Sequence, residues 1–259
     1  MNLDGHQLTA SLSSPLLIAN GGTLTLTGNG LIENSNYIGS AINGGKIIIE
    51  NGSYISVTEA GFSATGTGSK VTMNGGTINA VEGGLNAFDN AEIEMNGGEI
   101  EISDNFGIAT NGTSGRGRNT IVMNGGKVTG HIKTAGYEAC GIYIANNDTF
   151  TMNGGEIRAD GGTGLCMRGG DVTINDGTIV ATGEPGKDGW IGDKKTVLEG
   201  ISAIVFDEKA GYPGNGGMKL TVNGGTITGV DHAIQVLSSI ENPQVFVTGG
   251  TFTPAYPEG

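Results

Sequence analysis

The sequence predicts an all-β protein, a single right-handed parallel β-helix of about nine coils with three short strands in each coil. Three observations predict this solenoid. A short Asn-Gly motif recurs along the chain, a second motif recurs in step with it, and the residues between them alternate between apolar and polar. Glycine is also abundant, at 50 of 259 residues, well above its usual share of ~7%.

The first motif is MNGG, and its Asn marks one position in each coil. Four strict copies are followed by looser ones, at Met73–Gly76, Met95–Gly98, Met123–Gly126, Met152–Gly155, Ile174–Gly177, Val222–Gly225 and Val247–Gly250. The expected column is Asn51, Asn74, Asn96, Asn124, Asn153, Asn175 and Asn223, with Thr27 before it and Thr248 after it. Most intervals are 22 to 29 residues, which is typical of a solenoid, and one is 48.

The second motif is a small residue followed by an apolar one, upstream of each Asn. Its small residues are Gly39, Gly61, Gly84, Gly107, Gly141, Gly164, Gly200 and Ala233. Because the two columns keep step, the interval of 48 residues is interpreted as one coil lengthened by insertions. Lys70–Met73, Thr77–Ala80 and Gly141–Ala145 alternate with period two, which indicates strands. Such short strands need stacked neighbours, ~4.8 Å apart, to bury their apolar faces.

The MNGG motif itself is expected to form a sharp turn. Asn and Gly tolerate positive φ better than other residues. Stacking would place each Asn over the next, so their amides are expected to form an internal hydrogen-bonded ladder. The Met that precedes each Asn is expected to fill the core.

Four insertions interrupt the repeat within the single expected domain, residues 1–259. They lie at 112–119, 130–139, 183–199 and 207–217. Loops on a rigid scaffold commonly carry function. A functional site is therefore expected in these loops and in the outward column beside them, which consists of Ser63, Asn86, Ala109, Tyr143, Cys166, Ser202 and Gln235 and which Arg168 and Ile204 are expected to extend.

A carbohydrate site is the hypothesis for this region. Tyr137, Tyr143, Arg168 and Trp190 are expected to line a shallow groove, because aromatic rings stack on sugar faces while polar groups fix hydroxyls. Asp160 and His131 complete the set of candidate ligand-binding residues. The alternative is that Trp190 only anchors its own loop and His131 is an ordinary loop residue.

An acidic column precedes the small-apolar motif. Its members are Glu59, Glu82, Asp104, Glu138, Asp160, Glu199 and Asp231. Carboxylates suit Ca²⁺, so a possible calcium site is one interpretation and a solvated turn edge is the other. No other cofactor is expected.

Composition excludes several classes of partner. There are 26 acidic against 13 basic residues and no basic cluster, which argues against nucleic acid. No run of 18 apolar residues exists, so no membrane insertion is expected. No signal peptide opens the chain, so either the protein does not use that export route or the sequence is a piece of a longer chain.

The cysteines Cys140 and Cys166 fall in different columns of adjacent coils. Their offset of three residues corresponds to ~10 Å along the strands, beyond the usual reach of a disulfide. Free thiols are therefore predicted, with Cys166 facing outward.

The Asn register and the flanking pattern T-[VI]-x-[MIV]-N-G-G-x-[IV] resemble the pectate-lyase-like parallel β-helix proteins. The opening Leu3–Thr9 and the closing Val247–Phe252 resemble β-helical domains of bacterial cell-surface proteins. This resemblance implies an extracellular, non-catalytic module that binds a polysaccharide or cell-surface glycan, as adhesins do. A phage tail or receptor-binding protein is the first alternative, and a polysaccharide lyase or glycoside hydrolase is the second. Gly130–Lys133 resembles a fragment of the polygalacturonase pattern, but its Asp partners are missing, so no catalytic residue is predicted.

Overall fold

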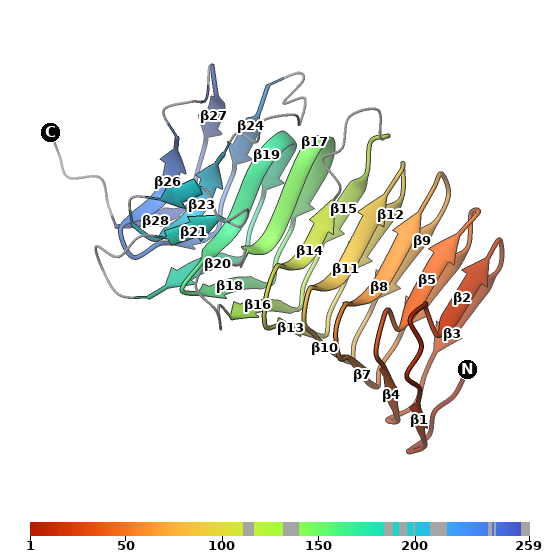
Figure 1. The fold of residues 1–259 in the computed structure, drawn as a ribbon. Coiled ribbons are helices and arrows are strands. Elements are labelled where there is room, and N and C mark those ends of the chain that lie inside the picture. Colours follow the sequence, from red (N-terminus) through yellow and green to blue (C-terminus); the bar gives the residue numbers. More distant parts are fainter. Residues whose placement is uncertain are drawn as a thin grey trace, which may run out of the picture.

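The computed structural model describes residues 1–110, 117–131, 140–183, 189–191, 196–198, 200–207, 217–237, 240 and 242–254, with 189–191 and 196–198 as backbone only. The described residues form strands and turns and no helix. The strands stack into a parallel β-solenoid of about nine coils, with β1 (Gln7–Thr9) and β28 (Thr251–Thr253) at opposite ends of the stack (Figure 1). The predicted fold class is confirmed.

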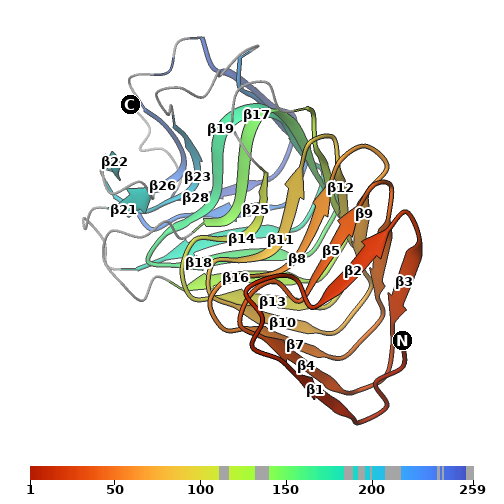
Figure 2. The same cartoon turned by 45° about the vertical axis from the view of Figure 1, so that its right-hand side comes forward.

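The strand after each Asn-Gly turn belongs to a 10-stranded parallel sheet, which forms one side of the solenoid (Figure 2). Its order is β1 (Gln7–Thr9), β4 (Leu31–Asn34), β7 (Ser53–Ser56), β10 (Thr77–Ala80), β13 (Glu99–Ile102), β16 (Lys127–His131), β18 (Glu156–Asp160), β20 (Thr178–Thr182), β25 (Thr226–Thr228) and β28 (Thr251–Thr253).

The other two strands of each coil belong to a 16-stranded sheet. One row comprises β2 (Leu17–Asn20), β5 (Gly39–Ile42), β8 (Ala60–Thr65), β11 (Gly83–Phe88), β14 (Phe106–Thr110), β23 (Ser202–Phe206) and β26 (His232–Val236), and it carries the small-apolar motif from β8 onward. The predicted place of Gly39 in that motif is wrong, because Gly39 pairs with Phe62 rather than with Gly61. The row that precedes the Asn turn holds β3 (Thr23–Leu26), β6 (Lys46–Ile49), β9 (Lys70–Met73), β12 (Glu92–Met95), β15 (Thr120–Met123), β24 (Lys219–Val222) and β27 (Gln244–Val247). The long strands β17 (Cys140–Met152) and β19 (Thr163–Ile174) run through both rows and join them.

The core consists of the inward residue of every second strand position. The column Met73, Met95, Met123 and Met152 is fully buried and continues through Ile174 and Val222, as predicted. The column ends at Val247, which is 51% exposed, because β27 pairs only with β24 and no described strand stacks beyond it.

Glycine in the small-apolar column is required by close packing. A Cβ on Gly107 would lie 2.1 Å from Val128 Cγ1 and 2.6 Å from the carbonyl oxygen of Gly141 in the next coil. The Asn-Gly turn has a different requirement. Its second glycine has positive φ, 86° at Gly98 and 87° at Gly126, so this glycine, rather than the Asn, adopts the conformation that side chains avoid.

The Asn ladder exists, but on the surface. Its bonds run from Asn96 to Asn74 (2.9 Å), Asn124 to Asn96, Asn153 to Asn124, Asn175 to Asn153 and Asn223 to Asn175 (2.8 Å each), and from the Thr248 hydroxyl to Asn223 (2.9 Å). These Asn residues are exposed, so the expectation of an internal ladder is wrong.

Asn51 is not part of the ladder, and its predicted place is corrected. Ile49 pairs with Met73, which places Glu50 opposite Asn74, and the Asn74 amide donates to Glu50 Oε1 at 3.1 Å. The segment Glu50–Gly52 has one glycine where the other copies have two, so its Asn falls one position late. The bond from Asn223 to Asn175 and the pairing of β24 with β19 confirm that the interval of 48 residues is one lengthened coil.

The eighth coil also departs from the predicted register. Leu165 pairs with Ile204, so Ala203, rather than Gly200, is the small residue of the column. The sequence Gly200–Ile204 contains two small-apolar pairs, and the second one stacks. Ile204 is therefore buried in the main core, and Val205, opposite Cys166, replaces Ser202 in the outward column.

Most of the predicted insertions lie outside the described residues. Residues 111–116, 132–139, 184–188, 192–195, 199 and 208–216 are not described. Gly130 and His131 belong to β16, and the third insertion contains a short antiparallel pair, β21 (Gly189–Ile191) with β22 (Thr196–Leu198). Within the described part of the chain, no helix has the length and apolar character needed to cross a membrane.

Candidate functional site

The structure separates the candidate ligand-binding residues onto two sides of the solenoid. Tyr143 and Arg168 lie on the outer side of the 16-stranded sheet, whereas His131 and Asp160 lie on the outer side of the 10-stranded sheet. The backbone of Trp190 is in β21, next to β19, and its side chain is not described. Tyr137 lies outside the described residues.

Tyr143 and Arg168 are buried, so the expectation that they face solvent is wrong. Arg168 is 1% exposed and Tyr143 is 4% exposed. The Arg168 Nε donates to Asp207 Oδ2 at 2.6 Å, and its guanidinium carbon lies 5.5 Å from the Tyr143 ring centroid. The Phe106 ring packs against Tyr143 at 4.3 Å. These contacts make the pair part of the packing rather than an accessible surface.

Tyr143 belongs to a second apolar cluster, separate from the main core. It consists of Ala109, Cys140, Tyr143, Ala145, Cys166 and Val205. Both cysteines are free, as predicted, and both are buried. Cys166 points away from the main core, but it is not exposed, so that part of the expectation is wrong.

The structure also contains a buried polar cluster around Asp148 and Asn119, which the sequence did not predict. The Asp148 carboxylate is fully buried, and its Oδ1 accepts hydrogen bonds from the Asn119 backbone N–H (2.6 Å) and side-chain amide (3.2 Å). Burial raises the pKa of Asp148, although the Asn119 donors oppose the shift. The register shift between Asn146 and Thr149 places Asp148 there, and a local irregularity of this kind leaves no periodic signal in the sequence.

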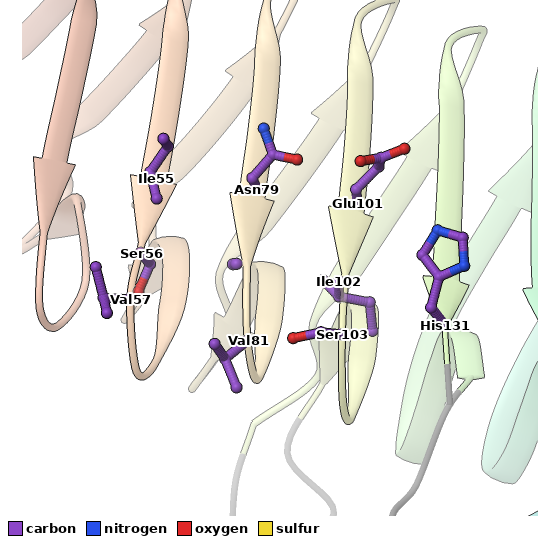
Figure 3. Close-up of a pocket in the computed structure, with 10 residues that line it drawn as sticks. Ile55, Ser56, Val57, Asn79, Val81, Glu101, Ile102, Ser103 and His131 are labelled. Atoms are coloured by element: carbon purple, nitrogen blue, oxygen red, sulfur yellow. The ribbon is translucent and has the colours of Figure 1, made fainter. Parts of the chain in front are cut away.

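The outer face of the 10-stranded sheet carries a groove of about 290 Å³, shown in Figure 3. It crosses β7, β10, β13 and β16 near the ends of these strands. Apolar and polar side chains both line it, and its residues are Ile55, Ser56, Val57, Asn79, Ala80, Val81, Glu101, Ile102, Ser103 and His131. Ile55, Asn79 and Glu101 form one outward row, because Asn79 pairs with Ile55 on one side and with Glu101 on the other.

His131 closes the groove at β16 and is held from the next coil. Its Nδ1 lies 3.1 Å from Asp160 Oδ2, and the two side chains are 38% and 34% exposed. Arg158 Nε lies 2.9 Å from Asp160 Oδ1, and the Thr182 hydroxyl donates to the same oxygen at 2.6 Å. The Asp160 carboxylate is thus fixed on two sides, and it fixes the imidazole of His131. The structure therefore brings two predicted residues together at the edge of an open groove.

The acidic column forms only a partial cluster. Burial, followed by the carboxylates of Glu59 and Asp104, raises the pKa of Glu82. No group of three or more His, Cys, Asp or Glu side chains among the described residues has the arrangement of a metal site. Glu138 and Glu199 lie outside the described residues, and a calcium site remains a prediction.

No family model matches the chain. Comparison with curated proteins and with solved structures likewise gives no match. The groove offers an amide, a carboxylate, hydroxyls and an imidazole beside partly exposed aliphatic side chains.

Proposed function

We propose that this protein is a surface-displayed carbohydrate-binding module and that the groove of Figure 3 is its binding surface. The single observation that carries the proposal is the composition of this groove. Sugars present apolar C–H faces together with hydroxyl edges, and a binding site for them combines apolar contacts with a few placed polar groups. Val57 and Val81 supply the apolar contacts, and Asn79 and Glu101 supply the polar groups.

The direction of the groove favours a polymer over a single sugar. The groove crosses successive coils, so its lining side chains recur at the spacing of neighbouring strands, ~4.8 Å. This spacing is close to the length of one pyranose unit. A linear glycan lying along the solenoid axis would meet an equivalent position on every coil.

Charge favours a neutral glycan. The formal net charge is −13, and the exposed carboxylate of Glu101 lies in the groove. A field of this sign repels polyuronates and phosphorylated polymers. Surface display, which the resemblance to cell-surface β-helical domains implies, would give such a module access to extracellular glycans.

A glycan array with matched variants tests the proposal. Wild type is expected to bind neutral linear glycans. Glu101→Gln is expected to lose about 10-fold in affinity, because it weakens one charge-assisted hydrogen bond. Glu156→Gln, which lies on the same sheet outside the groove, is expected to bind as wild type does. Failure of wild type to retain any glycan would contradict the proposal. Loss of binding in Trp190→Ala with Glu101→Gln unaffected would place the site at β21 and β22 instead.

A further inference from the structure

One row of side chains on the outer face of the 10-stranded sheet combines a hydroxyl, an imidazole and a carboxylate. His131 pairs in register with Asp160 on the neighbouring strand. Ile102, the last residue of β13, pairs with Gly130, and the residues that follow these two, Ser103 and His131, line the same groove. His131 and Asp160 are therefore outward neighbours at the strand spacing of ~4.8 Å, and Ser103 lies just beyond the end of β13, on the other side of His131 from Asp160.

The imidazole is held as a general base requires. The Asp160 carboxylate contacts His131 at Nδ1, 3.1 Å away, which leaves Nε2 on the opposite side of the ring. In serine hydrolases a carboxylate orients the imidazole through Nδ1, and Nε2 then accepts the proton of the nucleophile. Arg158 and Thr182 both bind Asp160 Oδ1 and leave Oδ2 for His131.

Ser103 lies beside His131 in the same groove. In Figure 3 its hydroxyl points away from the imidazole. Rotation about the Cα–Cβ bond into another staggered position would bring the oxygen toward His131, and serine populates all three staggered positions. Catalytic hydrogen bonds are commonly long or misaligned until substrate is bound.

We propose that this row hydrolyses acyl esters, with Ser103 as nucleophile, His131 as general base and acid, and Asp160 as the positioning residue. The substrate class is an O-acylated, for example O-acetylated, neutral glycan lying in the groove. The identity of this substrate rests on the proposed glycan binding, whereas ester hydrolysis by the row is independent of it.

The reaction balances without any group beyond water. Ser103 Oγ attacks the carbonyl carbon of the acyl group while its proton passes to His131 Nε2. The C–O bond to the sugar breaks, and the sugar oxygen leaves with that proton. Water, deprotonated by His131, then attacks the acyl-serine and releases the free acid, and Ser103 regains its proton.

Two measurements on the purified chain test the row. A fluorophosphonate probe should label one serine, which peptide mass spectrometry should assign to Ser103. Hydrolysis of p-nitrophenyl acetate should fall by about 100-fold or more in Ser103→Ala and in His131→Gln, the range expected for a nucleophile or a general base. Ser53→Ala, on the outer face of β7, is the matched control and should keep both signals.

Asp160→Asn separates positioning from folding. This variant should lower kcat and the rate of probe labelling while leaving KM close to that of wild type, and its thermal melting should remain cooperative. Labelling of a different serine, or hydrolysis by wild type no faster than by Ser103→Ala, would overturn the proposal. Ester hydrolysis with no acetate released from an acetylated glycan would keep the catalytic row and reject only the glycan substrate.

Discussion

The Asn74 side-chain amide donates a hydrogen bond of 3.1 Å to the carboxylate of Glu50, so the surface ladder begins on a glutamate and bypasses Asn51. Each Asn above that point donates to the one below it and accepts from the one above. Asn51 and Asn124 thus have the same sequence neighbour, a glycine, but different structural environments. Substitutions at Asn51 and Asn124 therefore compare an Asn outside the ladder with one inside it.

Asn124→Ala should destabilise the protein, and Asn51→Ala should not. The first removes two hydrogen bonds of 2.8 Å, to Asn96 and from Asn153. Hydrogen bonds contribute about 0.5–1.5 kcal/mol each, and because the ladder is exposed we expect a total loss of about 1 kcal/mol. The second should change stability by less than about 0.5 kcal/mol. Urea unfolding followed by circular dichroism measures both, and equal losses would contradict the assigned register.

Gly107→Ala should be far more harmful than Gly22→Ala. The added methyl at Gly107 meets Val128 and the Gly141 carbonyl, neither of which can move without separating two coils. We expect a loss of about 1–3 kcal/mol or more, the range of overpacked cores. A Cβ on Gly22 meets nothing within 4 Å, so that variant should fold as wild type. Thermal melting of the two variants checks the comparison.

Arg168→Met should destabilise the protein by about 3–5 kcal/mol, because it leaves the buried carboxylate of Asp207 without the cation it contacts. The double variant Arg168→Met, Asp207→Leu removes both charges and should regain much of this loss. Chemical denaturation of the single and double variants gives the two free energies. A double variant no better than the single one would show that other contacts of Arg168 dominate.

Asp148→Asn should change how stability depends on pH. The pKa of Asp148 is raised in the folded state, whereas aspartate in the unfolded chain has a pKa of about 3.9. As pH rises from that value, the unfolded state loses its proton first and binds fewer protons than the folded state, so the contribution of Asp148 to stability falls. It falls no further above the folded pKa.

The Asp148→Asn variant cannot ionise at this position and should lack that fall. Relative to the variant, wild type should be most stable at about pH 3 to 4 and progressively less stable toward neutral pH. Unfolding midpoints measured for both proteins across this range give the difference. A difference that does not change with pH would contradict the raised pKa.

The sequence was sufficient to predict the coil length, the strand positions and the Met column, because each follows from a pattern that repeats in every coil. It failed at single-residue register. The sequence does not show that Glu50, rather than Asn51, occupies the ladder position, and Gly200–Ile204 contains two equivalent small-apolar pairs. In both segments the register is set by which residues pair across neighbouring strands, and the spacing in the sequence does not reveal it.

The candidate site was predicted in part. His131 and Asp160 were named, but their contact depends on strands 29 residues apart meeting in register. Ser103 was missed because an isolated serine carries no signal until its row is known. Tyr143 and Arg168 were placed on the correct face, but period-two alternation shows only which face a side chain takes. It does not show whether that face is accessible.

The glycine column described above has a consequence for how this protein can diversify. The line from Gly61 to Ala233 holds only glycine or alanine, and a Cβ on Gly107 would already meet Val128 and the Gly141 carbonyl, so this line of the solenoid accepts only the smallest side chains. Changes in chain length occur in the segments before and after this line of the sequence, where the insertions lie. The loops can therefore be exchanged while the coil spacing beneath Asn79, Glu101 and His131 stays constant, so new specificity does not require a new scaffold.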